Sequence, residues 1–227
     1  MLRHVVSLWM LWAFLTASLI GVKTAWADES YFMIVFGQQG GANQVELSHT
    51  FATFVKATGT GPDKTKYAID SHTISWMPRS LDVKVLRRPE EGVNLDLKGT
   101  LSHAAAVKAE VCMWGSFQIK KGLYDRALLQ ETRLKKGDID YKVVDARFRP
   151  DSAMNCVHAV CDIDMDNGLL PTGAAHGQEA SLLVLTHLSR WIVDGDKPNE
   201  WIGQRLELGK DIVRRDFQPK AVDNLKK

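Results

Sequence analysis

The segment between Ser48 and Trp76 constrains the fold most strongly, because it predicts two strands joined by a turn. Residues 48–57 (SHTFATFVKA) and 67–76 (YAIDSHTISW) are rich in the β-branched and aromatic residues that strands favour. Residues 58–66 (TGTGPDKTK) between them have the glycine, proline and aspartate of a turn. The pattern predicts a β-hairpin and therefore an antiparallel sheet, although a longer path between the strands would also satisfy it.

Each strand of this hairpin carries one histidine, His49 and His72. Neighbouring strands lie about 4.8 Å apart, so both imidazoles can reach one site if they share a face of the sheet. They share a face if the numbers of paired residues add to an odd value, and an even value separates them. The loop does not determine this register, so a shared site and two unrelated strand histidines both stay open.

The rest of the chain alternates between strand-like and helix-like patterns. Residues 94–97 alternate like a strand, whereas residues 101–111 fit either a strand or a helix. One α+β domain over residues 28–227 is the expected organisation. Its further expected strands are Tyr31–Phe36, Leu81–Leu86 and Tyr141–Val144, its expected helices are Gly122–Lys136 and Glu179–Val193, and Trp201–Leu208 is a last short element.

A cysteine beside a predicted helix start is the main candidate for chemistry. Ser152 or Asn155 would cap a helix here, which places Cys156 in or near the first turn. Free amide groups and the helix dipole favour an anion at that position, so the thiol is biased toward thiolate. Such a setting suits a cysteine nucleophile, and a small buried apolar side chain is the alternative interpretation.

The N-terminus has the organisation of a secretory signal peptide. Arg3 and His4 precede an apolar run, and Ala25-Trp26-Ala27 forms an A-x-A cleavage site. Cleavage after Ala27 would leave an exported, periplasmic or secreted protein with no lasting membrane anchor, although an uncleaved anchor is the alternative for so long a run.

The net charge limits the expected binding partners, and the number of cysteines limits the possible disulfides. The full chain has 29 basic and 27 acidic residues, and loss of Arg3 and Lys23 with residues 1–27 leaves 27 of each. A neutral exported chain does not favour nucleic acid or an anionic membrane as its main partner. Three cysteines leave at least one thiol in an oxidising compartment, and a disulfide between Cys112 and Cys161 would leave Cys156 as that thiol.

Two short motifs raise the question of a cofactor or metal. Residues 37–41 (GQQGG) are glycine-rich but match neither phosphate-binding fingerprint, so a plain loop is expected. Asp162, Asp164 and Asp166 have the spacing of the first EF-hand ligands. The glycine that follows comes one place late, and Gly173 occupies the position of the closing glutamate. We therefore expect a solvated acidic turn, with no metal and no cofactor.

The order of these residues resembles a known superfamily. Residues 155–160 (NCVHAV) look like the Asn-Cys-Glu-His-Phe motif of lecithin:retinol acyltransferase-like proteins. Ala127, Gly137 and residues 141–144 (YKVV) before it look like that branch's helix and strand. With a histidine on one strand and a polar residue on the next, the chain resembles the circularly permuted papain-like superfamily, which also contains relatives of NlpC-type cell-wall peptidases.

The resemblance implies an antiparallel sheet packed against helices and a Cys-His-His site. Cys156 would be the nucleophile, His49 the base and His72 the residue that orients it. The expected function is then an exported cysteine hydrolase or acyltransferase that acts on an amide, ester or thioester, with cell-envelope peptides or acyl groups as substrates. A non-catalytic exported binding module that keeps the fold is the alternative.

Overall fold

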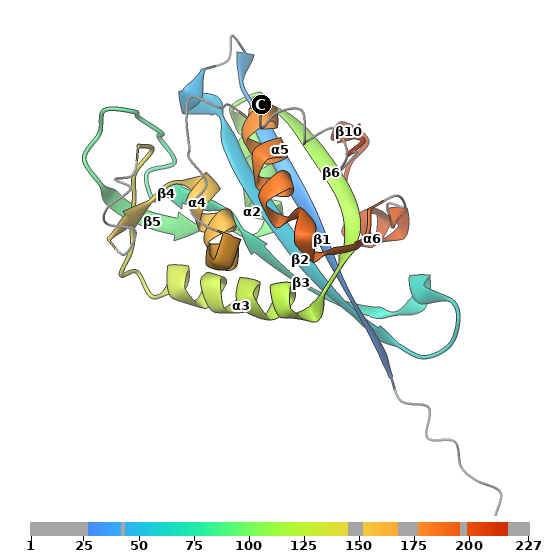
Figure 1. Cartoon of the computed structure of the whole chain (residues 1–227). Helices are drawn as coiled ribbons and strands as arrows, with labels where there is room; N and C mark the ends of the chain where they lie inside the picture. The colour runs from blue at the N-terminus through green and yellow to red at the C-terminus, as the bar shows by residue number, and fades with distance from the viewer. Residues whose placement is uncertain (1–26, 42–43, 145–151, 168–176, 196–198, 218–227) are drawn as a thin grey trace, which may run out of the picture.

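Continuous apolar runs build the central sheet. The computed structural model describes residues 27–41, 44–144, 152–167, 177–195 and 199–217 (Figure 1). Strand β1 (Asp28–Gln39) pairs with β2 (His49–Gly59) on one side and with β6 (Glu110–Ile119) on the other, both antiparallel. From Phe32 to Phe36 every side chain of β1 is fully buried, as expected for a central strand covered on both faces.

The predicted hairpin is confirmed, with one change at its end. Strands β2 and β3 (Ala68–Ile74) pair antiparallel around a loop that contains the short 3-10 helix η3 (Lys64–Lys66). The expected second strand breaks after Ile74, and β4 (Trp76–Pro78) joins a different sheet. The first sheet has the order β10-β6-β1-β2-β3, with β9 also on β6, and the second has the order β4-β5-β7-β8.

The ambiguous region after the hairpin contains a strand, a helix and another strand. Strand β5 (Glu90–Asn94) precedes α2 (Leu97–Ala106), whose first turn is capped by the Asp96 carboxylate, which accepts a hydrogen bond from Gly99 N. The predicted strand at Leu81–Leu86 is wrong. Leu81 has φ 57° and donates its N–H to Pro78 O, so the chain turns there, and Leu86 is exposed.

Local propensity correctly located the long helices. Helix α3 (Lys121–Lys135) ends just before Gly137, which adopts φ 79°. Helix α5 (Gly177–Leu188) is shorter than predicted, because its end passes into η5 (Ser189–Trp191) and then strand β9 (Ile192–Asp194). The remaining elements are η2 (Val45–Leu47), β7 (Asp140–Tyr141), β8 (Ala153–Met154), α4 (Cys156–Cys161), η4 (Asp162–Asn167), α6 (Glu200–Arg205) and β10 (Val213–Arg215).

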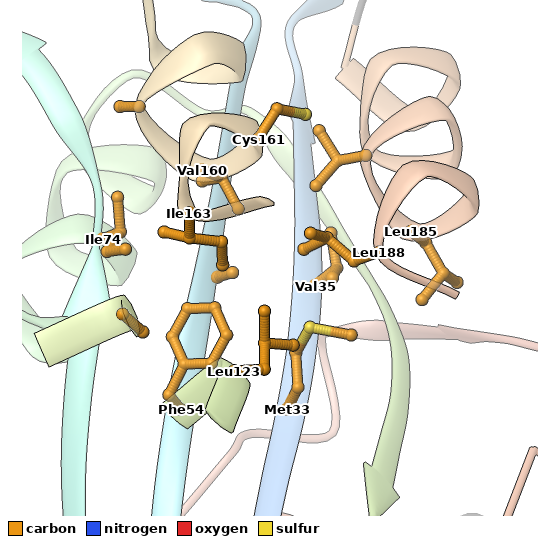
Figure 2. Packing of buried hydrophobic residues seen from close by; sticks show 14 of the residues in the cluster. Met33, Val35, Phe54, Ile74, Leu123, Val160, Cys161, Ile163, Leu185 and Leu188 are labelled. Atoms are coloured by element: carbon orange, nitrogen blue, oxygen red, sulfur yellow. The ribbon is translucent and has the colours of Figure 1, made fainter. Parts of the chain in front are cut away.

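Helices cover both faces of the first sheet. Helices α3, α4 and α5 lie on one face, over a core that includes Met33, Val35 and Phe54 (Figure 2). Helix α2 and helix α6 contribute to a second core on the other face, around Phe36 and Phe51. The described residues thus form an α+β structure with mixed sheets and five α-helices, which confirms the α+β part of the predicted fold. None of those helices is long and apolar enough to cross a membrane.

Candidate functional site

Of the two predicted helix caps, Ser152 and Asn155, the structure has Asn155. The Asn155 carboxamide oxygen accepts a hydrogen bond from His158 N at 2.9 Å, and α4 begins at Cys156. The Asn155 side chain also donates to Val143 O at 3.2 Å, which fixes the cap against the preceding loop. Cys156 is 9% exposed, so its thiol lies at the margin of the core. The local arrangement is the one expected for a cysteine at the first position of a helix.

Helix α4 packs on the α3–α5 face of the sheet. Its residues Val160 and Cys161 point toward β1 and β2, where they join Val35 and Phe54 in one core (Figure 2). A histidine that serves as base for Cys156 would therefore have to approach from this face of the sheet.

His49 lies on the opposite face. Its ring stacks on Phe51, a member of the α2-side core, and its Nε2 lies 2.9 Å from Ser75 Oγ. Ser75 in turn accepts a hydrogen bond from Thr100 Oγ1 of α2 at 2.8 Å. Burial lowers the pKa of His49 to about 3, with a smaller contribution from His103. His49 is thus a neutral, buried side chain tied to α2.

The strand register explains this separation. Phe54 pairs with His72 in the β2–β3 ladder, so paired numbers add to an even value. No bulge interrupts β2 between His49 and Phe54, and residues five apart in a strand point to opposite faces. The prediction that His49 and His72 share a site beside Cys156 is therefore wrong, and His72 cannot orient the His49 ring.

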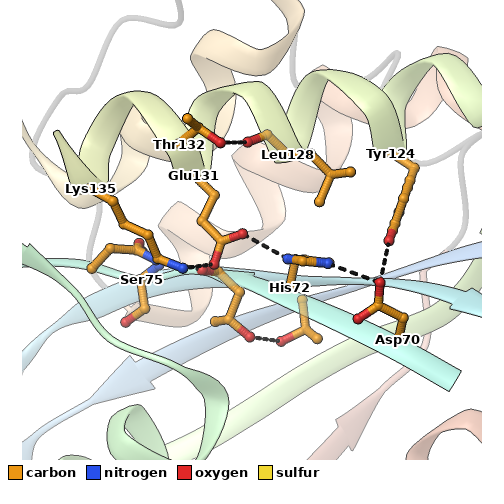
Figure 3. A network of polar contacts seen from close by, with 11 residues as sticks. Asp70, His72, Ser75, Tyr124, Leu128, Glu131, Thr132 and Lys135 are labelled. Carbon is orange, nitrogen blue, oxygen red and sulfur yellow. Dashed lines mark hydrogen bonds and ion pairs between the residues drawn. The ribbon is translucent and has the colours of Figure 1, made fainter.

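His72 instead belongs to a polar cluster between β3 and α3 (Figure 3). Its Nδ1 lies 2.8 Å from Glu131 Oε2, and its Nε2 lies 3.2 Å from Asp70 Oδ2. Tyr124 donates its hydroxyl to the same Asp70 oxygen at 3.3 Å, and burial raises the pKa of Tyr124 well above its usual value. The cluster connects an edge strand to a helix, which is a structural role.

Another histidine, His103, does not replace His49 as a base for Cys156. His103 is on α2, close enough to His49 to act on its pKa, and so on the same side of the sheet. His176 lies outside the described residues. Cys156 keeps the helix-start position that motivated the nucleophile prediction, and its catalytic role stays a prediction.

The three cysteines form no disulfide in the structure, so the considered Cys112–Cys161 bond is absent. Burial raises the pKa of the Cys161 thiol well above its usual value, and it also raises that of Cys112. Both residues are buried side chains, Cys161 in the α4 core and Cys112 on β6.

Two arginine side chains of the same chain pair with the acidic segment after α4. The fully buried Asp164 carboxylate accepts hydrogen bonds from Arg190, and Asp166 accepts one from Arg126 at 2.7 Å. Among the described residues no group of three or more His, Cys, Asp or Glu side chains could hold a metal ion. The calcium interpretation therefore gains no support from these residues. The segment differs from the expected solvated turn at Asp164, which is buried and paired, whereas Met165, Asp166 and Asn167 are exposed.

A pocket lies where β1, β6 and the start of α5 meet. Its volume is about 380 Å³, within the usual range for small-molecule sites. Gly37 and Gln39 from β1 pair with Cys112 and Glu110 of β6, so all four lie on one face of the sheet. Helix α5 completes the lining with Gln178, Glu179 and Leu182.

Two glycines allow α5 to begin directly on β1. A Cβ at Gly37 would lie 2.6 Å from both Gly177 O and Ser181 Oγ, so a side chain there would collide with α5. Gly177 adopts φ 43°, and a Cβ there would lie 2.2 Å from Gln39 Oε1. Trp114 Nε1 donates to Ser181 Oγ at 2.9 Å and holds the first turns of α5 against the sheet.

Sequence reasoning missed this pocket. The glycine-rich segment 37–41 predicts a plain loop from its sequence, whereas Gly37 to Gln39 continue β1 in the structure. The useful signal was the pair of glycines at Gly37 and Gly177, but their contact spans 140 residues of sequence and is not visible without the fold. The chain matches no protein-family model, no curated protein and no solved structure.

Proposed function

We propose that the chain is an exported, non-catalytic binding protein whose ligand occupies the pocket between β1, β6 and α5. The observation that carries this proposal is the pocket itself, which combines a size suited to a small molecule with a lining that contains four polar side chains, those of Gln39, Glu110, Gln178 and Glu179. A few polar groups in fixed positions are what orient a ligand and give specificity. Export is part of the proposal and rests on the N-terminal sequence.

The pocket walls are rigid elements, which favours binding over a flexible surface contact. Two walls are neighbouring strands of the central sheet, and the third is held on them by the Gly37–Gly177 approach and the Trp114–Ser181 hydrogen bond. A site formed before the ligand arrives loses less conformational entropy on binding.

The position of His49 argues against a catalytic mechanism in which His49 is the base for Cys156. A general base must come within hydrogen-bond reach of the proton it takes. The His49 side chain faces α2, and its Nε2 forms a hydrogen bond with Ser75 Oγ. Burial keeps the imidazole neutral, so His49 is a structural residue of the core beneath α2.

A substitution that fills the pocket with a large side chain tests the binding proposal. Gln178→Trp places a large ring at the pocket wall, and Gln204→Trp, at an exposed position of α6, is the matched control. Compounds that raise the Tm of the protein in a small-molecule screen should lose their effect in Gln178→Trp and keep it in Gln204→Trp. Ligands that bind both variants equally would reject the pocket as the site.

A second candidate is supported by one specific observation, the position of Cys156 at the first residue of a capped helix. This candidate is a cysteine hydrolase or acyltransferase of permuted papain-like architecture, acting on peptide or acyl substrates through Cys156. Its oxyanion donor would be the Cys156 backbone amide at the helix start.

Mass spectrometry after exposure to an acyl-directed covalent probe separates the two candidates. The binding proposal expects no acyl adduct on Cys156, and pocket ligands that bind Cys156→Ala as tightly as the unmodified protein. A Cys156 adduct that forms at substoichiometric probe concentration and turns over with time would establish the enzyme instead.

A further inference from the structure

The ring of His72 has a carboxylate at each of its two nitrogens (Figure 3). Nδ1 lies 2.8 Å from Glu131 Oε2 on α3, and Nε2 lies 3.2 Å from Asp70 Oδ2 on the same strand as the ring. A neutral imidazole has one donor and one acceptor nitrogen, whereas the imidazolium ion has two donors. An ionised carboxylate only accepts hydrogen bonds, so both contacts are hydrogen bonds only when the ring is an imidazolium ion.

Helix α3 supplies the groups that hold the two carboxylates in place. Lys135 Nζ lies 2.7 Å from Glu131 Oε1, which leaves Oε2 of the same carboxylate to face His72. Tyr124 donates its hydroxyl to Asp70 Oδ2 at 3.3 Å, and its ring meets the His72 ring edge to face. The Glu131 side chain is only 13% exposed, so solvent screens its contact with the imidazole less than it screens a surface ion pair.

The neighbouring strand β2 adds no competing charge to the ring. Phe54 is the residue of β2 that pairs with His72. Lys56 pairs with Asp70 in the same ladder, but its ammonium group forms an ion pair with Glu29 of β1 at 2.6 Å. The ring of His72 therefore meets two carboxylates, a tyrosine and a phenylalanine.

The charge of the ring decides whether this cluster is balanced. With an imidazolium ion, His72 and Lys135 offset the carboxylates of Asp70 and Glu131. With a neutral ring, one nitrogen presents its lone pair to a carboxylate, and the cluster keeps an excess negative charge. Histidine ordinarily changes charge between pH 5 and 8, whereas carboxyl groups in general ionise at lower pH.

We propose that His72 is a pH-dependent link between β3 and α3, which holds the strand to the helix while the ring is protonated and weakens when the ring loses its proton. Strand β3 is the last strand in the order of the first sheet, and an edge strand can loosen while the central strands stay paired. This regulatory role is independent of the proposed ligand pocket and of Cys156.

The sign of the effect separates His72 from His49. Protonation destabilises the buried His49, which has a serine on its Nε2 and a pKa lowered by burial. Protonation of His72 instead completes two hydrogen bonds to carboxylates. A rise in pH should therefore loosen β3 in particular, even where it stabilises the protein as a whole.

Amide hydrogen exchange of the full folded chain tests the proposal. Protection factors of β3 and of the central strand β1 are measured between pH 5.5 and 8 and corrected for the intrinsic exchange rate at each pH. The ratio of β3 to β1 protection should fall about two- to fivefold as the pH rises, the size expected for a partly exposed ion pair. A ratio that stays constant or rises overturns the proposal.

Three variants identify the responsible groups. His72→Gln does not titrate and should remove the pH dependence of the ratio. Glu131→Gln should reduce it, because an amide can donate to or accept from Nδ1 and so suits both forms of the ring. Asp125→Asn, on the same helix in an exposed pair with Lys121, is the matched control and should leave the ratio as in the unmodified protein. A pH dependence that persists in His72→Gln, or an equal effect of Asp125→Asn and Glu131→Gln, would show that His72 is not the link.

Discussion

Arg190 holds the carboxylate of Asp164 with two nitrogens of its guanidinium group. Nε lies 2.8 Å from Oδ2, and Nη2 donates to Oδ1. Asp164 is fully buried in η4, whereas Arg190 belongs to η5, so the pair connects the segment after α4 to the end of α5. Burial raises the pKa of Asp164, but the hydrogen bonds and charge of Arg190 outweigh this effect, so the pKa lies below its usual value.

Removal of Arg190 should therefore destabilise the protein strongly. Arg190→Met leaves the buried carboxylate with one ion pair among the described residues, the longer contact to Arg126 at 3.7 Å, and should lower the free energy of unfolding by about 3 kcal/mol. Urea denaturation measures this change. Lys121→Met removes an exposed pair with Asp125 and is the control, with an expected loss of at most about 1 kcal/mol. Equal effects of the two substitutions would contradict the argument.

His49 should make the fold sensitive to acid. Its pKa is about 3 in the folded protein, against 6.5 for the unperturbed group, so the unfolded chain binds a proton first. The stability due to neutral His49 is fully present above pH 6.5 and is lost as the pH falls toward 3, by a few kcal/mol in order of magnitude.

The variant His49→Gln keeps a hydrogen-bonding group near Ser75 but does not titrate. Urea denaturation between pH 7 and 4 should show a smaller loss of stability than in the unmodified protein. Some loss should remain, because burial also lowers the pKa values of His103 and His187. An unchanged pH dependence would mean that His49 is not the neutral buried group described.

Alkylation of Cys156 should not depend on His49. Because the two residues belong to opposite sides of the sheet, His49→Gln should leave the pH midpoint of Cys156 alkylation by iodoacetamide unchanged. Peptide mass spectrometry measures the rate at each pH, and the buried Cys161 serves as an internal control. If the midpoint rises in a variant that thermal melts show to be folded, His49 and Cys156 interact, and the catalytic pair must be reconsidered.

Substitution of Gly37 should destabilise the protein, whereas substitution of Gly41 should not. Gly37→Ala drives a methyl group into the backbone oxygen of Gly177, and overpacking of this kind costs about 1–3 kcal/mol. Gly41→Ala meets nothing within 4 Å and should be nearly neutral. Thermal melts compare the two variants. A stable Gly37→Ala protein with an unaltered pocket would show that α5 does not need this close approach.

Export should remove residues 1–27. The basic start, the apolar run and the Ala-Trp-Ala sequence motivate this prediction. Intact-mass measurement of exported protein should give a chain that begins at Asp28, which is also the first residue of β1. Recovery of the full-length chain only after membrane extraction would indicate an anchor instead.

Local patterns predicted much of the secondary structure, because capping and turn chemistry depend on residues only a few positions apart. Asn155 caps α4 through the amide three residues later, and Gly137 ends α3 within one turn. Prediction failed where pairing between strands distant in the sequence decided the local structure. Leu81–Leu86 alternates with charged residues, but no neighbouring strand pairs with it among the described residues, and Ile192 left its expected helix to pair with β6.

By itself the sequence therefore determined the strand–turn–strand unit, the helix start at Cys156 and the α+β class. Only the tertiary structure decided which side chains meet. A one-residue change in register would have placed His49 and His72 on one face, and nothing in the loop between them specifies that register. The pocket likewise exists because Gly37 and Gly177 touch, a contact set by how α5 packs on the sheet and not by any short-range pattern.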